Sequence, residues 1–146
     1  MSGIVCALRG GPDSQPTIRT AINLAKETGQ TVYFLYVINL DFLTYTSTSR
    51  IHVVAQEMRQ MGEFILLTAQ AQAEAQNIKA QGIVRQGQVR KEIIQFCHEI
   101  EAEYVILGHP RGQDEIDIFT HKHLDQFTQR IEQESGAKAV IAKDAS

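Results

Sequence analysis

The sequence lacks several features that would point to a specialised class of protein. It has only 2 cysteines in 146 residues, Cys6 and Cys97, and both lie inside apolar segments rather than in a spaced framework. This usage predicts reduced, buried thiols in a cytoplasmic protein. No apolar run approaches the roughly 20 residues of a membrane-spanning helix, and the start of the chain has no basic export region. We therefore expect no membrane partner.

Positive charge and catalytic patterns are also scarce. The 14 Lys and Arg residues are outnumbered by 17 Asp and Glu residues, which gives a net charge of −3. This balance argues against a nucleic-acid partner, because nucleic-acid-binding domains carry a basic surface. The sequence contains no catalytic triad, no paired carboxylates and no Walker-type loop, so we expect a protein that is not an enzyme.

Apolar segments alternate with amphipathic ones along a single domain that covers residues 1–146. Strands are predicted at residues 4–8, 31–38, 82–87, 104–107 and 139–142, where β-branched and apolar residues form short runs. Parallel strands joined by right-handed helical crossovers are the expected arrangement for such an alternation. No internal repeat interrupts it.

The helices between these strands are predicted from apolar residues at helical spacing. One long helix is predicted over residues 51–81, and its length implies either an overhanging end or a break at Gly62. The segment Asn39–Arg50, rich in Thr and Ser, is predicted to be a mobile loop over the ligand crevice. Helix positions expected to face the core are Ile18, Ala21, Ile22, Ala25, Val89, Ile93, Phe96, Cys97, Ile100, Thr120, Leu124, Phe127 and Ile131, with Gly29 and Gly136 closing the first and last helices.

The segment Tyr104–Gly112 contains the strongest candidate for a binding site. A buried strand is followed by Gly108-His109-Pro110-Arg111-Gly112, and its glycines would let the backbone approach a ligand closely. Ligands of open parallel sheets bind beyond the carboxyl ends of the strands. His109 lies in this loop without a nucleophile or an orienting carboxylate, which favours a binding or solvent-facing residue over a catalytic one.

Arg9, His121 and His123 can each be interpreted as functional or as structural residues. Arg9, at the end of the first strand, would either hold an anionic ligand or form an ion pair with Asp13 or the acidic segment 114–117. His121 and His123 are two residues apart on a predicted helix and therefore cannot share one metal ion. We expect no metal site.

Taken together, the chain resembles the universal stress protein family from Ile4 to Ala142. The resemblance is carried by Ile4–Ser14, which is similar to the family's first strand and Asp-Gly-Ser turn, and by Ala21–Ala25 in the following helix. It is also carried by Val84–Gly87 and by Ala102–His109, which is similar to the family's "Ala-Asp-hydrophobic-Val-Gly" signature. The resemblance implies an α/β fold of the adenine nucleotide alpha hydrolase type. Its open five-stranded parallel sheet would have the order 3-2-1-4-5, helices on both faces, and a homodimer formed through the edge strand Ala139–Ala142.

The chain departs from the ATP-binding members of this family at defined positions. Those members carry an acidic residue where this chain has Arg9, and a Gly-x2-Gly-x9-Gly-Ser/Thr motif after the fourth strand. Here Gly108 and Gly112 are one residue too far apart, and Asp125-Gln126 stands where the Gly-Ser/Thr pair is expected. A carboxylate there would repel phosphate, so we expect no tight binding of ATP.

Three functions remain open at this point. The leading one is a non-enzymatic, dimeric, stress-response protein that binds a small anionic or nucleotide-like ligand between the first and fourth strands. The alternatives are a protein-interaction module without a ligand and a slow ATP-binding hydrolase. The ligand site would consist of Ala7, Leu8, Arg9, Val37, Gly87, Leu107, Gly108, His109, Arg111 and Gly112.

Overall fold

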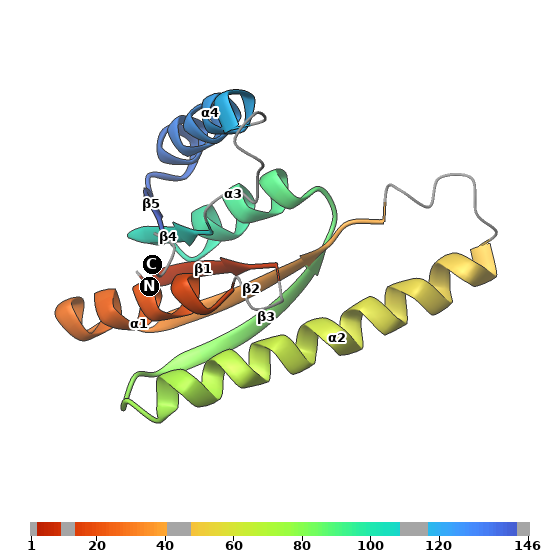
Figure 1. Cartoon of the computed structure of the whole chain (residues 1–146), viewed down its shortest axis with the longest axis horizontal. Helices are drawn as coiled ribbons and strands as arrows, with labels where there is room; N and C mark the ends of the chain where they lie inside the picture. Colours follow the sequence, from red (N-terminus) through yellow and green to blue (C-terminus); the bar gives the residue numbers. More distant parts are fainter. Residues whose placement is uncertain (1–2, 10–13, 41–47, 109–116, 143–146) are drawn as a thin grey trace.

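A computed structural model of the chain describes residues 3–9, 14–40, 48–108 and 117–142, with the side chains of 48–49 and 117–124 outside the description. The elements alternate between strand and helix throughout (Figure 1). Their bounds are β1 Ile4–Leu8, α1 Ser14–Thr28, β2 Val32–Ile38, α2 Thr48–Glu74, β3 Ala80–Gln86, α3 Val89–Glu99, β4 Tyr104–Leu107, α4 Asp117–Ser135 and β5 Lys138–Ile141.

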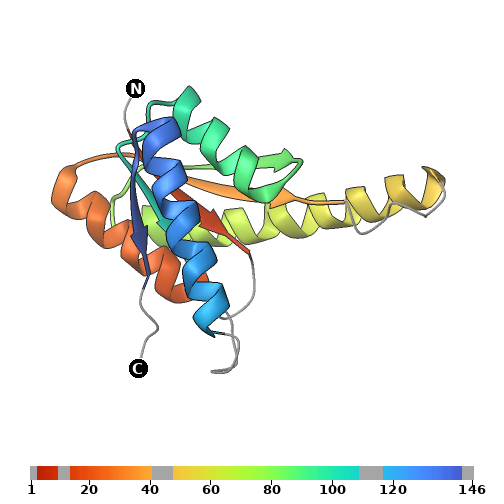
Figure 2. The same cartoon turned by 90° about the horizontal axis from the view of Figure 1, so that it is seen from above.

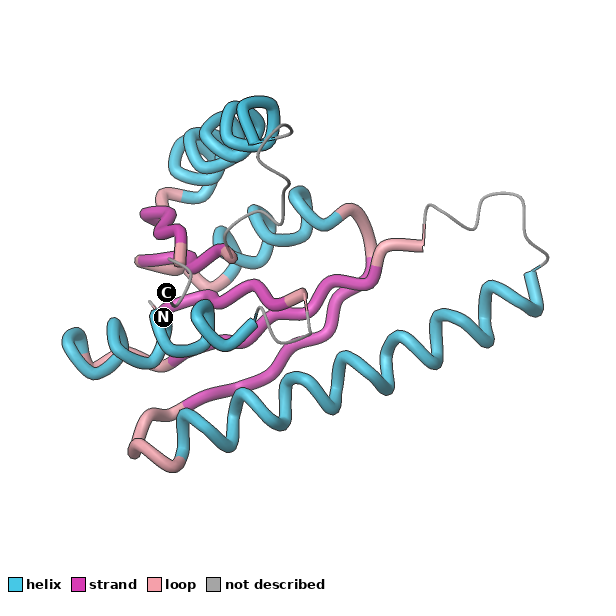
Figure 3. Tube along the Cα trace, viewed as in Figure 1, coloured by secondary structure: helices cyan, strands magenta, loops and turns pink. Residues whose placement is uncertain are grey.

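The strands form one parallel sheet in the order β3-β2-β1-β4-β5, which confirms the predicted fold (Figure 3). β1 lies in the middle, so Cys6 is paired with Phe34 of β2 on one side and Ile106 of β4 on the other. β3 and β5 form the two edges. Central strands buried on both faces require continuous apolar runs, and this explains why β1, β2 and β4 are so apolar.

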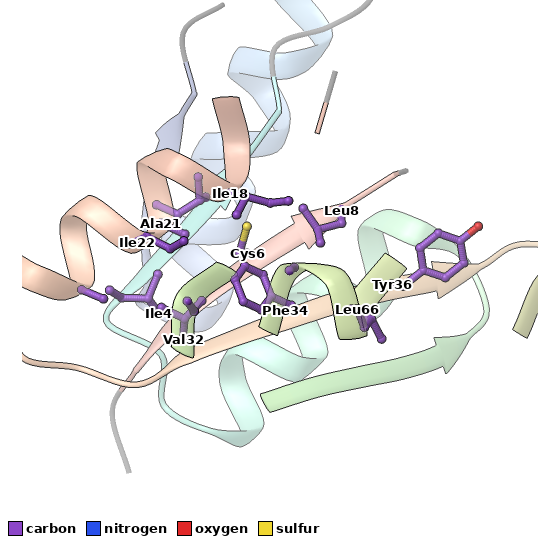
Figure 4. Packing of buried hydrophobic residues seen from close by; sticks show 14 of the residues in the cluster. Ile4, Cys6, Leu8, Ile18, Ala21, Ile22, Val32, Phe34, Tyr36 and Leu66 are labelled. Carbon is purple, nitrogen blue, oxygen red and sulfur yellow. The ribbon is translucent and has the colours of Figure 1, made fainter. Parts of the chain in front are cut away.

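Helices cover both faces of the sheet and create two separate cores. α1 and α2 pack on one face, where Figure 4 shows Ile18 and Ile22 of α1 and Leu66 of α2 near Cys6 and Phe34. α3 and α4 pack on the other face, which contains Val5, Leu35 and Val105 (Figure 2). This division follows from the strand geometry, because successive side chains of a strand point to opposite faces.

The long helix α2 differs from its prediction at both ends. It begins at Thr48, inside the segment Asn39–Arg50 that was expected to be a loop, of which residues 41–47 lie outside the described residues. It ends at Glu74, because the chain turns through Asn77, whose φ is 63°, and starts β3 at Ala80. Ile78, which was assigned to the helix, instead packs against the core from this turn. The helix is unbroken at Gly62 and extends beyond the sheet at its N-terminal end, which confirms the overhang, one of the two alternatives that its length implied (Figure 1).

Gly62 is explained by packing. A Cβ built on Gly62 would lie 2.4 Å from Cδ2 and 2.8 Å from Cε2 of Tyr36. Real side chains do not approach so closely, so this glycine allows α2 to pack directly against the tyrosine ring at the end of β2.

The remaining helices largely match the expected core faces. The buried positions of α1 are confirmed, as are those of Phe127 and Ile131 in α4. In α3 the prediction holds for Ile93, Phe96 and Cys97, but Val89 is wrong, because it is 39% exposed in the first turn. Ile100 is partly buried against the same core. Thr120 and Leu124 lie outside the described side chains. Gly29 and Gly136 have φ values of 71° and 80°, the left-handed conformation that ends helices.

The structure also bears on the predictions about the two cysteines and about membrane-spanning helices. Cys6 and Cys97 are both unbridged and fully buried. Burial raises the pKa of the Cys97 thiol to about 12 and raises that of Cys6 as well, because a thiolate is poorly solvated in an apolar core. Across the described ranges, none of the helices combines the length and apolarity needed to cross a membrane.

Candidate functional site

The topology places a switch point between β1 and β4, where the crevice was expected. The chain moves from β1 through β2 to β3 on one side, then returns to the other side of β1 to form β4 and β5. The crossover helices that follow β1 and β4 therefore leave the sheet in different directions. In open parallel sheets such a switch point, at the carboxyl ends of the strands, is where ligands bind. Arg9 and Gly108 directly follow these two strands.

Arg9, Gly108 and Thr17 are brought together at this point. A Cβ built on Gly108 would lie 3.4 Å from Nη2 of Arg9 and 3.1 Å from Oγ1 of Thr17. The guanidinium therefore lies beside the Gly108 backbone, and the arginine itself is exposed to solvent. Thr17, from the first turn of α1, is only 3% exposed. A cation next to a side-chain-free backbone position can bind an anionic group that approaches the crevice.

The other predicted site residues fall into two groups. Leu8 and Leu107 are each 5% exposed and belong to the cores on opposite faces of the sheet, so only their backbones can reach the crevice. Ala7 and Val37 are half-buried next to the α3/α4 core. His109, Arg111 and Gly112 lie outside the described residues. So do Asp13 and the side chains of 114–117, the ion-pair partners considered for Arg9.

Gly87 lies beside an ion-pair network that sequence reasoning missed. Its N–H donates to the Ile38 carbonyl at 2.9 Å, and a Cβ built on it would lie 2.8 Å from Oε2 of Glu92. Nε of Arg85 lies 3.0 Å from Oε1 of Glu92, and Nη1 of the same guanidinium donates to Glu99. The edge of the site at Gly87 is therefore lined by a carboxylate that already has a cationic partner.

This network also accounts for the position of Glu99, the last residue of α3. Acidic residues near a helix C-terminus are unfavourable next to the helix dipole. Here the hydrogen bond and charge of Arg85 lower the pKa of Glu99, while Glu99 raises the pKa of Arg85. The guanidinium also lies 5.6 Å from the centroid of the Phe96 ring, a cation–π contact. At the other end of α3, Arg90 lies 5.3 Å from the Phe127 ring centroid. A strand arginine followed by glutamates at helical spacing was the available signal.

The described residues show no other arrangement typical of a reactive site. Within them, no group of three or more His, Cys, Asp and Glu side chains could hold a metal ion. His121 and His123 lie outside the described side chains. An open depression of about 500 Å³ lies at Thr31, Glu74 and Asn77, and one of about 330 Å³ lies between α2 and β3. Both depressions are away from the β1/β4 crevice.

A doubly wound parallel sheet with a polar switch point defines the general class, and comparison with known proteins defines the family. The model of the universal stress protein family matches residues 1–128, and the chain belongs to this family. A universal stress protein of Methanocaldococcus jannaschii is 24% identical over 106 residues, which cover 72% of this chain and 62% of the relative. The match thus spans less than two thirds of the relative's length.

Solved structures share the fold at low sequence identity. The universal stress protein of Archaeoglobus fulgidus in complex with dAMP is 13% identical, with a TM-score of 0.64 over 98% of each chain. A universal stress protein in complex with cAMP is also 13% identical, with a TM-score of 0.70 over 99% of this chain and 98% of the other. Identities this low establish a common fold, but they do not identify a ligand for this chain. The ligand has to be inferred from the chain's own residues.

Proposed function

We propose that this protein is a non-enzymatic universal stress protein that binds a small anionic or nucleotide-like ligand in the β1/β4 crevice. The observation that carries the proposal is the position of the Arg9 guanidinium next to Gly108. Arginine presents a planar fork of N–H donors that matches phosphate and carboxylate oxygens. Gly108, without a Cβ, allows the Arg9 guanidinium and the Thr17 hydroxyl to lie close against its backbone, which holds the guanidinium at the end of β4.

The chemistry favours a ligand with a single phosphate over one with three. Two solved relatives hold dAMP and cAMP, each with one phosphate; a single guanidinium balances the one charge of a cyclic phosphodiester and about half the charge of a phosphate monoester. Tight binding of ATP would need the phosphate-binding loop that this chain lacks. Asp125 lies inside α4 (Asp117–Ser135) and not before its start, which corrects the expected position of its charge; the case against tight ATP binding therefore rests on Arg9 and on the spacing of Gly108 and Gly112. Each lost contact to a charged group costs about 1–3 kcal/mol.

The same proposal includes a homodimer formed through β5. This strand is a sheet edge, and its residues Ala139, Val140 and Ile141 are only half-buried within one chain. An apolar edge strand is usually covered, because its free backbone groups promote association. Glu132 already accepts a hydrogen bond from the outward N–H of Ala139 at 3.1 Å. Pairing of two β5 strands would therefore replace this side-chain acceptor with a backbone carbonyl.

Isothermal titration calorimetry with AMP, cAMP, inorganic phosphate and Mg-ATP tests the ligand proposal. We expect AMP or cAMP to bind more tightly than Mg-ATP, and no ligand to be turned over. Arg9→Asp should weaken binding at least about tenfold, since a charge-assisted contact is lost and a repulsion is introduced. The matched control is Arg130→Asp, which makes the same charge change on exposed α4, where Arg130 pairs only with Glu134 at the next turn.

The result separates the open functions. Binding that is equal in wild type and Arg9→Asp would refute the role of Arg9. Absence of binding by all probes would favour the protein-interaction module. Mg-ATP bound in the low micromolar range, with slow release of phosphate, would favour the hydrolase instead.

A further inference from the structure

Helix α2 exposes several large apolar side chains on the side that the described part of the chain does not cover. The sheet-facing side of α2 is buried through Leu66, Ala69 and Ala73. On the opposite side Phe64 is 71% exposed and Leu67 is 64% exposed. Apolar side chains on both sides of a helix are expected when both sides are covered, because large exposed apolar patches mark interaction sites.

The outward residues follow the spacing of a helix–helix seam. We define the outer seam as Arg50, Val53, Phe64, Leu67, Ala71 and Glu74, all of them exposed. Together with Glu57 and Gln60, which fill the gap after Val53, they recur at alternating intervals of four and three residues along the 27 residues of α2. This heptad spacing is that of positions that meet another helix in a coiled coil.

The seam is also physically accessible. The N-terminal half of α2 extends past the sheet (Figures 1 and 2). Val53, in this overhanging half, is 55% exposed. The seam carries no lysine, and charges along the whole of α2 nearly balance, so self-association is not opposed by a large net charge.

We propose that the outer seam binds the outer seam of a second copy of this chain, with the two α2 helices antiparallel. In a full-length antiparallel overlap centred on Gly62, Arg50 lies opposite the partner's Glu74. Val53 then lies opposite the partner's Ala71, and Phe64 and Leu67 lie opposite the partner's Gln60 and Glu57, whose aliphatic stems would cover them. Opposite charges thus meet at both ends, whereas a parallel arrangement would place each charge against its like.

The size of the seam predicts a reversible contact. A helix of 27 residues is about 40 Å long and about 10–12 Å wide, so each copy contributes roughly 400 Å². The sum for two copies is about 800 Å², at the low end of interface sizes and typical of transient association. Gln60 and Glu57 within the seam weaken the packing further, as polar residues do at such positions.

Sedimentation velocity over a concentration series tests this surface in full-length protein carrying Val140→Lys, which removes the proposed β5 pairing. The inference does not depend on that pairing or on the ligand site. We expect the mass to double with rising concentration, and Phe64→Lys combined with Leu67→Lys to weaken the doubling at least about tenfold. The control is Val89→Lys, which adds one of these two positive charges at an exposed apolar position of α3; each single α2 variant, Phe64→Lys or Leu67→Lys, matches it in charge. A single constant mass, or doubling that persists in the α2 double variant, would overturn the proposal.

Thiol cross-linking tests the orientation, because both native cysteines are fully buried and do not compete. Val53→Cys mixed with Ala71→Cys should cross-link between copies with a short bis-maleimide. Val53→Cys alone should not, since its two copies would be about 27 Å apart in the antiparallel overlap. Cross-linking of Val53→Cys alone as fast as in the mixture would overturn this arrangement.

A charge swap gives an independent check. Arg50→Glu and Glu74→Arg should each weaken association, and the double variant should restore it. Failure of the double variant to restore association, with unchanged circular dichroism, would contradict the register. If the seam proves inert in all three experiments, another protein covers it and the inference is wrong.

Discussion

Replacing Gly62 with alanine should reveal how closely α2 packs on the sheet. In a helix interior, alanine is favoured over glycine by about 1 kcal/mol. Against this, the new Cβ would lie 2.4 Å from Cδ2 and 3.1 Å from Cγ of Tyr36, so the whole ring must move. Tyr36 is only 8% exposed, and overpacking of such a site costs about 1–3 kcal/mol. The net effect of Gly62→Ala is a loss of about 0–2 kcal/mol.

The sign of the effect should reverse when the ring is absent. In a Tyr36→Ala background the clash disappears, and Gly62→Ala should then stabilise the protein by about 1 kcal/mol. The difference between the two backgrounds, about 1–3 kcal/mol, is the coupling energy of the contact. Tyr36→Ala alone costs about 3 kcal/mol, which a domain with about 5–15 kcal/mol of stability can lose and remain folded.

Urea denaturation of the four proteins measures this coupling. Unfolding free energies are taken from the midpoint and slope of each transition. The control Gln60→Ala, at an exposed position of the same helix, should have the same small effect in both backgrounds. If Gly62→Ala stabilises the protein equally with and without the Tyr36 ring, close packing is not the reason for this glycine.

Three further predictions use other parts of the structure. Val140→Lys should reduce the molecular mass measured at low concentration from that of a dimer to that of a monomer. Glu132→Ala should strengthen the dimer, because it frees the N–H of Ala139 at the edge of the sheet. Unchanged masses in both variants would place the interface elsewhere. The pKa of Glu99 is lowered below its ordinary 4.5 in the folded state, so its stabilising charge is present above that pH and lost as the pH falls through the folded value. The stability difference between wild type and Glu99→Gln should therefore be constant near neutral pH and vanish in acid; a difference that grows on acidification contradicts the pairing. Cys6 and Cys97 should resist a thiol reagent at pH 8 until denaturant is added, because burial holds their pKa values well above that pH, and rapid labelling of native protein would show that the core opens.

Local sequence patterns were sufficient for the elements whose burial is simple. The run Ile4–Leu8 is apolar on both sides and became the central strand, with cores on both faces. α1 was equally clear, because its apolar residues recur at helical spacing up to a glycine with positive φ. Short apolar strands alternating with amphipathic helices leave few arrangements that bury every apolar face, and the parallel sheet is the common one.

Residues whose roles depend on distant neighbours were beyond this reasoning. Ile78 continues a helical pattern, yet the sheet requires it in the turn before β3. Gly62 reads as a helix breaker until Tyr36, from another element, is placed against it. Val89 satisfies the spacing of a core residue but lies in the first turn of α3, beyond the area that the sheet covers.

The candidate site shows the same division. The sequence by itself determined the family resemblance, the switch point between the first and fourth strands, and the presence of Arg9 at the end of the first strand. Only the tertiary structure decided that the Arg9 guanidinium lies beside Gly108, and that Arg85 joins glutamates from two turns of α3 next to Gly87. Likewise, the exposed face of α2 could be recognised only from the structure, because the structure shows which other face of the helix packs against the sheet. The physical reason is range: periodicity and turn chemistry act over a few neighbouring residues, whereas contacts between elements depend on where the whole chain places them.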